Sequence, residues 1–261
     1  MLLISELAVG AVIGLIISTT GVGGGVIVLP VLTYFFGLDA LAAVATANLL
    51  SMLMKISSSY MHFRMGNIPL RQSLMILLIM IPGTVLASYG VTALSHSSYN
   101  QMEIEWGINL LVVLAILFSL YLFYCRIRGP EKPMMDTIPK SGLMKPLLLP
   151  GTGAGLLLGA TGVGGGIVVL PFLLRYAQMN IKQAIGVSLF VTMLLSGTSA
   201  FAYAQGGHTD WKLALILFIG SLLGIPFANY LLKQLPDKVF QYATLFLILC
   251  SAVLMGIRLV G

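Results

Sequence analysis

Residues 20–30 read Thr20-Gly-Val-Gly-Gly-Gly-Val-Ile-Val-Leu-Pro30, and residues 161–171 repeat them as Thr161-Gly-Val-Gly-Gly-Gly-Ile-Val-Val-Leu-Pro171. Nine of the eleven positions are identical between the two copies. Each copy sits inside a long apolar stretch, where four glycines in six residues and a following proline disfavour a continuous helix. The sequence therefore predicts an internal duplication with a helix break in each copy, at the depth where membrane proteins line cavities with irregular backbone.

The composition indicates an integral membrane protein. Hydrophobic residues make up 58% of the chain and charged residues only 8%, and the mean hydropathy is +1.01. Such a chain cannot bury its apolar side chains in one soluble core. Eight apolar stretches are each long enough for the ~20 residues that cross a hydrocarbon core, which predicts an all-α polytopic fold and excludes a β-barrel. The stretches cover residues 7–36, 40–63, 70–94, 102–124, 146–176, 180–205, 211–232 and 238–260.

The remaining chemistry of the chain points away from other classes. The net charge of +6 comes mostly from Lys and Arg in short loops, where they set topology and contact lipid headgroups, so no nucleic-acid partner is expected. Cys125 and Cys250 give neither a disulfide framework nor a metal-ligand pattern. Three scattered histidines without a mid-membrane carboxylate supply no catalytic group. We therefore expect no enzyme activity, no cofactor and no metal site.

The match between the two copies extends far beyond the glycine motif. At the offset that pairs Thr20 with Thr161, it continues without a gap over about residues 14–94 and 155–235, so that Gly66 matches Gly207 and Gly83 matches Gly224. The only sizeable polar stretch, which is rich in proline, joins the two copies and reads as a linker. We predict a first membrane repeat over residues 1–125, a cytoplasmic linker over 126–145 and a second membrane repeat over 146–261.

The basic residues favour repeats of inverted orientation. If all eight stretches cross and the linker is inside, nine Lys and Arg lie inside and four outside. If residues 7–36 and 146–176 are instead re-entrant hairpins, each repeat crosses three times and the count becomes eleven to two, which agrees better with the positive-inside rule. A straight helix over 7–36 would be about 45 Å long, whereas two legs of about 11–14 residues would reach the bilayer midplane and return. Eight full crossings with parallel repeats is the alternative.

The two predicted hairpin tips suggest an anion site. The second leg of each hairpin is expected to begin at Gly23–Gly25 or Gly164–Gly166, so its unpaired N–H groups and positive dipole end would face the protein centre. The alternative is that these glycines only permit close helix packing. A dinucleotide or P-loop turn is excluded, because neither copy has a Gly-Lys-Ser/Thr ending or a βαβ unit around it. The predicted ligand contacts at the tips are Thr20, Gly21, Gly23, Gly24, Gly25, Thr161, Gly162, Gly164, Gly165 and Gly166.

The apolar stretch after the first tip carries polar residues on one helical face, with Lys55 at its middle. Lys55 is the only Lys or Arg well inside an apolar stretch, and no Asp or Glu lies at comparable depth. Because a lysine near the bilayer centre costs on the order of 3 kcal/mol, an anionic substrate is the expected counter-ion. The alternative is that Lys55 extends its amine to the membrane surface. The predicted substrate contacts on this stretch and its uncharged second-repeat counterpart are Asn48, Ser51, Lys55, Ser188, Thr192 and Ser196, with Ser196 opposite Lys55.

The paired TGVGGG…P segments, the stretches ending in Asn48 and around Ser188, the four-plus-four plan and the length resemble the TauE/SafE family of bacterial membrane permeases over nearly the whole chain. Members of that family are associated with export of sulfite and organosulfonates, and some with movement of other sulfur compounds. The resemblance implies a permease of the bacterial cell membrane for a small sulfur-containing anion. The two convergent helix breaks favour alternating access around a midplane site. The resemblance supports a functional role for the two glycine segments only, whereas Asn48 and Lys55 are predicted from the residues themselves. The expected partners are a small anionic substrate and membrane lipids; an anion channel, an importer of another organic anion and a homodimer stay open.

Overall fold

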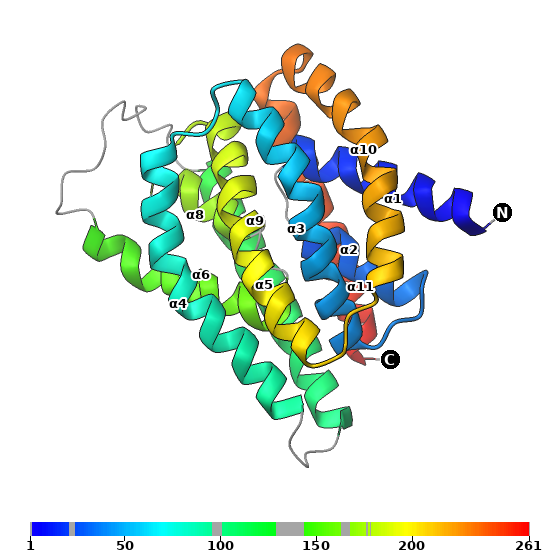
Figure 1. The fold of residues 1–261 in the computed structure, drawn as a ribbon. Helices are drawn as coiled ribbons and strands as arrows, with labels where there is room; N and C mark the ends of the chain where they lie inside the picture. Colours follow the sequence, from blue (N-terminus) through cyan, green and yellow to red (C-terminus); the bar gives the residue numbers. More distant parts are fainter. Residues whose placement is uncertain are drawn as a thin grey trace.

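The computed structural model describes residues 2–20, 24–95, 101–128, 144–162, 168–175, 177 and 179–260. Within these residues every regular element is a helix, and Figure 1 shows the helices gathered in one bundle. The helices are α1 (Leu2–Thr20), α2 (Gly24–Tyr34), α3 (Ala40–Arg64), α4 (Leu70–Ser95), α5 (Gln101–Arg128), α6 (Met144–Thr161), α8 (Val169–Arg175), α9 (Ile181–Gln205), α10 (Trp211–Gln234) and α11 (Asp237–Val260).

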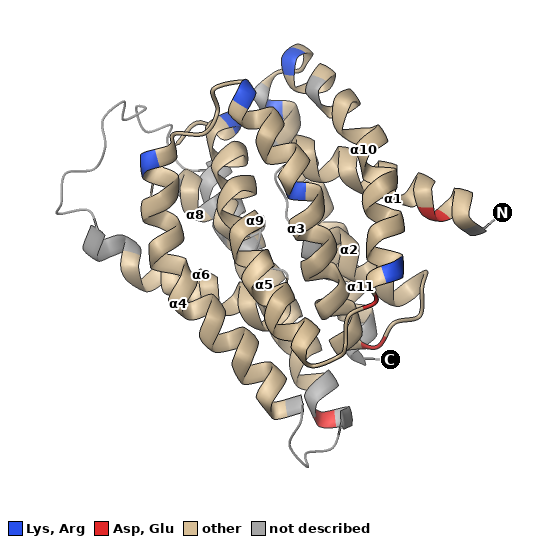
Figure 2. Cartoon of the chain, viewed as in Figure 1, with Lys and Arg blue, Asp and Glu red and all other residues tan. Residues whose placement is uncertain are grey.

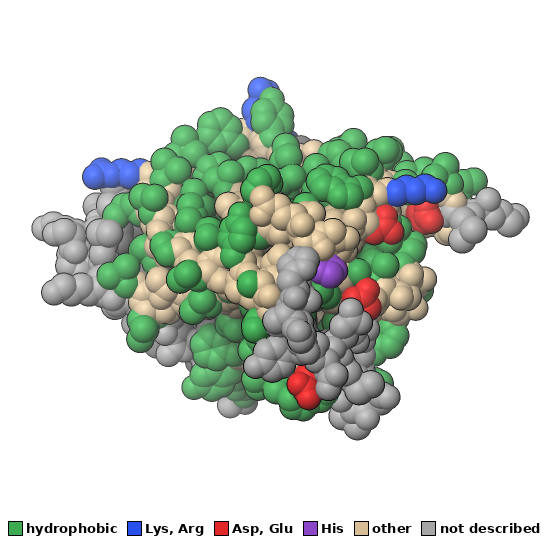
Figure 3. All heavy atoms as spheres, turned by 60° about the horizontal axis from the view of Figure 1, so that its bottom comes forward, with side chains coloured by type: hydrophobic (Ala, Val, Ile, Leu, Met, Phe, Trp, Pro, Cys, Tyr) green, Lys and Arg blue, Asp and Glu red, His purple; other side chains and the backbone are tan. Residues whose placement is uncertain are grey.

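The helices suit a membrane in length and in surface. In the part of the chain that the structure describes, six helices are long and apolar enough to cross a bilayer: α1, α3, α4, α9, α10 and α11. Shorter apolar stretches lie in α5 (Trp106–Phe118) and α6 (Leu148–Thr161). Large hydrophobic side chains face outward, among them Leu149, Phe35 and Leu223, and hydrophobic side chains are spread over the face seen in Figure 3. An apolar surface of this extent needs lipid around it, and the predicted all-α, multi-pass membrane fold is confirmed.

In each apolar stretch that contains the glycine motif, the described residues form one helix before the glycines and another helix after or within them. α1 ends at Thr20 and α2 begins at Gly24, whereas α6 ends at Thr161 and α8 begins at Val169. The first helix of each pair is longer than the predicted hairpin leg, with 19 residues in α1 and 18 in α6. The reason is that both helices begin before the predicted apolar stretch and continue to the last residue before the glycines. The expected helix start at Gly164–Gly166 falls in residues 163–167, outside the described part.

Local structure repeats at the offset of the sequence duplication. The bounds of α9 are those expected from α3 when Thr20 is paired with Thr161. The side chain of Asp39 caps α3 by accepting from the Ala42 N–H at 3.3 Å, and the equivalent Asn180 caps α9 by accepting from Gln183 at 2.8 Å. After each of these helices a glycine takes a positive φ, 74° at Gly66 and 75° at Gly207, which other residues adopt at a cost. Equivalent sequences therefore form equivalent structure in both predicted repeats.

α3 and α9 pack against each other in the middle of the bundle and run in opposite directions (Figure 1). Near the start of α3, the Thr46 hydroxyl accepts from the backbone N–H of Asp210, just beyond the end of α9, at 2.9 Å. Midway, Met52 lies beside Gly197. Just beyond the end of α3, Asn67 lies against Gly186 near the start of α9. Residue numbers along α9 therefore decrease as those along α3 increase, so the two helices are antiparallel.

The flanking helix pairs cross through glycines that let the two backbones touch. α1 packs on α10, and α6 packs on α4. Gly83 of α4 lies against the Thr152 carbonyl, and a Cβ built there would be only 2.5 Å from that oxygen. Its equivalent, Gly224 of α10, lies in the same way against Ala11 of α1. The helix before each glycine motif is thus held by the opposite predicted repeat, and small residues at the crossing are what permit the contact.

The two ends of the bundle differ in charge. Exposed or partly exposed basic side chains gather where α3 and α10 end and where α4, α9 and α11 begin: Arg64, Arg71, Lys182, Lys233 and Lys238. The opposite end carries Asp39, Glu103 and Asp210, with Lys212 as the basic exception among the described side chains. Figure 2 shows this separation, and Figure 3 shows acidic side chains on the end opposite to most of the basic residues. Such asymmetry is typical of a protein oriented in a bilayer.

We predict that Gly155→Ala lowers the thermal stability of the purified protein. A Cβ at Gly155 would collide with the backbone carbonyl of Met80, so α4 and α6 would have to separate, at a cost of about 1–3 kcal/mol. Gly90→Ala is the matched control, because a Cβ at this glycine in α4 meets nothing within 4 Å. Thermal unfolding in detergent measures both. Equal midpoints for the two variants would contradict close packing at this crossing.

Candidate functional site

Lys55 lies at the centre of the α3–α9 interface and is shielded from solvent. Its side chain is 1% exposed, and its Nζ donates to the Ser196 Oγ at 3.3 Å. Ser196 is the equivalent of Lys55 in the second copy, so the two side chains meet where the two predicted repeats face each other. The buried polar and charged side chains of the described residues include no Asp or Glu. The Lys55 amine does not extend to the surface in this structure, and a serine hydroxyl is its hydrogen-bond partner.

The face of α3 that carries Lys55 also holds polar atoms that lack a partner. The Asn48 Nδ2 donates to the Val44 carbonyl at 3.0 Å, and the Oδ1 of the same amide takes no part in this bond. This Oδ1 and the Ser51 Oγ are buried and have no hydrogen-bond partner. Buried polar atoms are nearly always paired in folded proteins, so unpaired ones mark places where a ligand or water can bind. The row from Asn48 through Ser51 to Lys55 therefore has unused hydrogen-bonding capacity.

The second glycine motif reaches this row. Gly162 follows α6, has φ of 66°, and lies against the Asn48 amide; a Cβ built on Gly162 would be 2.9 Å from the Asn48 Nδ2. A side chain at position 162 would therefore be both strained and crowded. Asn48 has no polar equivalent, because Leu189 occupies its place in the second copy. The structure thus brings one predicted tip residue and one predicted helix residue together, from opposite repeats.

The second repeat contributes three buried hydroxyls from α9. Ser188, Thr192 and Ser196 are each at most 1% exposed. The Thr192 Oγ1 donates to the Ser188 carbonyl at 2.6 Å, so its proton is used within the helix. Ser196 is joined to Lys55, and this hydrogen bond links the two helices at their centre. Because α3 and α9 are antiparallel, Asn48 and Ser188 lie toward opposite ends from this pair. We call the buried polar residues Asn48, Ser51, Lys55, Ser188, Thr192 and Ser196 along this interface the polar layer.

The two threonines before the glycine motifs, Thr20 and Thr161, form hydrogen bonds within the last turn of α1 and of α6. The Thr20 hydroxyl donates to the Ile16 carbonyl at 2.7 Å, and the Thr161 hydroxyl donates to the Leu157 carbonyl at 2.6 Å. In this conformation their protons are therefore used inside α1 and α6, whereas the sequence predicted donors to a ligand. Gly24 and Gly25 form the first turn of α2. The other predicted tip residues, Gly21, Gly23, Gly164, Gly165 and Gly166, lie outside the described residues.

His62 of α3 and its equivalent in α9, Tyr203, have a structural role that the sequence did not reveal. The His62 Nε2 lies 3.2 Å from the Ser18 carbonyl, and the Tyr203 hydroxyl donates to the Gly159 carbonyl at 3.0 Å. Asn67 Nδ2 lies 3.3 Å from the His62 Nδ1, which assigns the ring proton to Nε2 as the donor to Ser18. Both donors and both acceptors are related by the offset of the duplication. Each donor therefore forms a hydrogen bond with a carbonyl in the last turn before a glycine break. The equal separation of donor and acceptor in the two copies, 44 residues, is the signal in the sequence that could have revealed this pairing.

Three hollows on the outer side of the helices are lined almost entirely by apolar side chains. They lie between α5 and α11, between α2 and α11, and along α5, α6 and α8, with volumes of about 550, 210 and 460 Å³. None of the predicted site residues lines these three hollows. The polar layer between α3 and α9 is thus separate from these three hollows, and each of its six residues is at most 1% exposed.

Comparison with known proteins assigns the family. The model of the sulfite exporter TauE/SafE family matches residues 7–255. The chain belongs to this family. It is 24% identical to a probable membrane transporter protein of Bacillus subtilis over 98% of this chain and 99% of that protein. Probable membrane transporter proteins of Methanocaldococcus jannaschii (83% of each chain) and Haemophilus influenzae (88% of this chain, 85% of that protein) are each 27% identical to it. No solved structure matches the chain.

The chain is accordingly a multi-pass member of a membrane transporter family. The description of the family concerns sulfite export, and the relatives are described only as probable membrane transporters.

We predict that Gly162→Ala destabilises the protein more than Gly207→Ala does. Both glycines have a positive φ, so both variants carry the same backbone strain, but only a Cβ at Gly162 meets a side chain, that of Asn48. Thermal unfolding measures the difference. Adding Asn48→Ala should remove most of the excess destabilisation. Equal losses in the two single variants would show that Asn48 and Gly162 are not in contact.

Proposed function

We propose that this family member carries a small sulfur-containing anion, such as sulfite, a sulfonate or a related oxyanion, across the membrane by alternating access around Lys55. The buried Lys55, without a carboxylate among the buried described residues, is the observation that carries this proposal. A lysine held in the low dielectric of a membrane protein is costly unless an opposite charge accompanies it. A bound anion supplies that charge, and the match to a sulfite exporter family supports its chemical class.

Hydrogen-bond donors near Lys55 would hold the oxygens of such an anion. In the proposed complex the lysine ammonium offers its two remaining N–H groups, and the Ser51 and Ser196 hydroxyls turn toward the ligand. Helix α2, which begins at Gly24 and packs on α3, adds the favourable end of a helix dipole. The glycines of both tips would allow backbone N–H groups to approach the anion closely. A sulfonate or sulfite group has several acceptor oxygens, which suits a site rich in donors.

Alternating access requires two repeats that can exchange their conformations, and an inverted arrangement provides this. Three observations support inversion: equivalent helices α3 and α9 run in opposite directions, the crossings of α1 with α10 and of α6 with α4 are equivalent, and basic side chains gather at one end. Figure 1 also shows α1 and α6 lying obliquely to α3 and α9, which suits the entering legs of re-entrant hairpins. We propose that α3, α4, α5, α9, α10 and α11 are the six crossings, so that α1, although long enough to cross, is a hairpin leg and α5 crosses in its place. The linker is then in the cytoplasm and both termini are outside.

An anion channel is the competing function. The buried Lys55 and the closed polar layer favour a carrier, because a channel needs a continuous polar path and a site weak enough to release ions quickly. Saturable flux that is accelerated by unlabelled anion on the opposite side of a liposome membrane distinguishes the carrier. Flux that rises linearly with concentration and shows no counter-transport would identify a channel.

We predict that Lys55→Met abolishes anion transport while the protein stays folded. Methionine fills a similar volume and removes the charge, so affinity for the anion is lost but the cost of burying the charge is relieved. Uptake of labelled sulfite, thiosulfate, taurine and sulfoacetate into liposomes is measured beside Lys233→Met, which removes an exposed basic residue as control. Normal rate and affinity in Lys55→Met would refute the assignment of Lys55 to the anion site.

The exchange variant Lys55→Ser with Ser196→Lys tests the site more sharply. Because the two side chains meet at the interface of the predicted repeats, exchanging them returns the ammonium to nearly the same place from the opposite helix. We expect each single variant to be impaired and the exchange variant to regain at least one tenth of wild-type transport. Loss in the exchange variant as complete as in Lys55→Ser would show that the lysine must come from α3.

We predict that green fluorescent protein fused after Gly261 stays dark in cells, because it does not fluoresce when exported unfolded to the outer side. The proposed inverted topology places the C-terminus of α11 outside. A fusion within the linker, at residue 135, is the matched control and should be bright. Bright fluorescence from the C-terminal fusion would restore the alternative of eight full crossings.

A further inference from the structure

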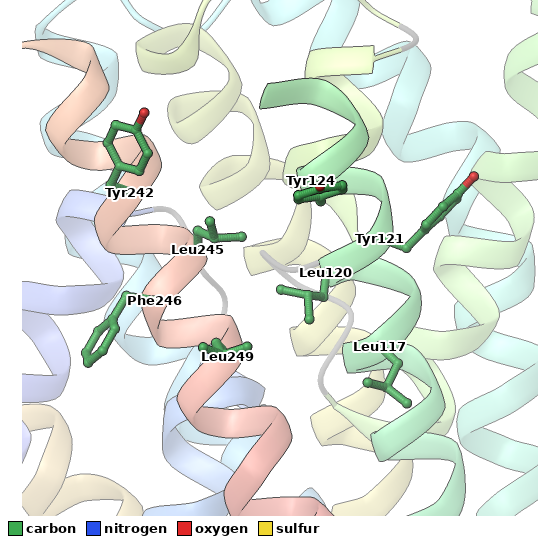
Figure 4. A pocket seen from close by; sticks show the side chains of 8 residues that line it. All are labelled: Leu117, Leu120, Tyr121, Tyr124, Tyr242, Leu245, Phe246 and Leu249. Carbon is green, nitrogen blue, oxygen red and sulfur yellow. The ribbon is translucent and has the colours of Figure 1, made fainter. Parts of the chain in front are cut away.

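A groove of about 550 Å³ runs along the outer side of the bundle between α5 and α11, away from the polar layer of Lys55. Leucines and one phenylalanine form its walls, and three tyrosines stand along them (Figure 4). The two helices run in opposite directions here, so Tyr124 stands at the level of Tyr242, and Leu117 at the level of Leu249. The lining residues are Leu117, Leu120, Tyr121, Tyr124, Tyr242, Leu245, Phe246 and Leu249. This surface faces the bilayer.

The groove is polar at one end only. Tyr124 and Tyr242 lie near the end of the bundle where basic residues gather, and their side chains are 46% and 61% exposed. The exposed Lys238 precedes Tyr242 by four positions, so it lies one helical turn closer to the membrane surface on the same side of α11. The opposite end, at Leu117 and Leu249, is apolar.

We propose that this groove, named here the α5–α11 groove, binds one anionic phospholipid from the leaflet at the basic end of the bundle. Its acyl chain lies between Leu120 and Leu245 and extends toward Leu117 and Leu249. Its phosphate lies close to Lys238 and the hydroxyl of Tyr242. The groove matches a phospholipid in three respects. Its apolar walls suit an acyl chain, its tyrosine hydroxyls lie at the level of the membrane interface, and the positive charge of Lys238 lies where the phosphate would be.

A second copy of the chain fits this surface less well. A symmetric dimer brings the same surface of both copies together, and two hollow surfaces facing each other leave a void rather than a packed core. A two-fold axis along the membrane normal would also place the basic ends of both copies side by side, where like charges repel. An acyl chain fills the hollow, and its headgroup neutralises the charge.

The experiment compares lipid binding to purified, delipidated protein by native mass spectrometry, with phosphatidylglycerol and phosphatidylcholine of identical chains as probes. Wild-type protein should retain one phosphatidylglycerol more tightly than phosphatidylcholine. Lys238→Gln should weaken phosphatidylglycerol binding about fivefold and leave phosphatidylcholine binding unchanged, since one surface lysine contributes about that factor toward anionic lipid. Lys233→Gln, at the same end of the bundle but on α10, is the matched control and should behave as wild type.

Leu245→Trp fills the groove and should reduce binding of both lipids, whereas Leu223→Trp on the exposed side of α10 should not. Equal affinity for the two lipids in wild type, or an unchanged preference in Lys238→Gln, would overturn the proposal. A dimer in wild-type spectra that Leu245→Trp converts to monomer would also overturn it, in favour of a second copy at this surface. Lys55→Met should bind phosphatidylglycerol normally, so the lipid site and the proposed transport site can fail independently.

Discussion

A helix that breaks inside a membrane leaves backbone carbonyls and N–H groups that lipid cannot satisfy, and much of this fold follows from that constraint. α1 and α6 end directly before the glycine motifs and must be enclosed by protein. His62 and Tyr203 donate to carbonyls in their last turns, and Thr20 and Thr161 donate to their own helices. The central position of α3 and α9, which carry His62 and Tyr203, is therefore required by the breaks themselves.

Enclosing the breaks demands close helix packing, and glycines provide it. α1 crosses α10 and α6 crosses α4 with backbone against backbone, through equivalent glycines in both predicted repeats. Each break is thus held by helices of both repeats, so movement at one break is coupled to the opposite repeat. The proposed alternating access uses this coupling: a shift of α3 against α9 would change the surroundings of both helix ends together.

Within this nearly symmetric frame the polar layer is asymmetric. Lys55 faces its own equivalent, Ser196, and the unpaired Asn48 Oδ1 has no counterpart, because Leu189 is its equivalent. One charge placed at the interface of two repeats can serve a single ligand from either side of the membrane, whereas two facing lysines would repel each other. The asymmetry therefore fits one anion bound at a time.

The sequence by itself determined the membrane class, the duplication, the position of both breaks and the unusual depth of Lys55, because hydropathy, glycine clusters and a constant offset between copies are local or directly repeated signals. It also placed Ser196 opposite Lys55. Only the tertiary structure decided that Asn48 meets Gly162 and that His62 and Tyr203 hold the ends of α1 and α6. These depend on how α3, α6 and α9 pack, and the residues of such contacts are too far apart in the chain for periodicity to reveal them. The α5–α11 groove likewise exists only between two packed helices, and neither sequence by itself indicates that the other lies beside it.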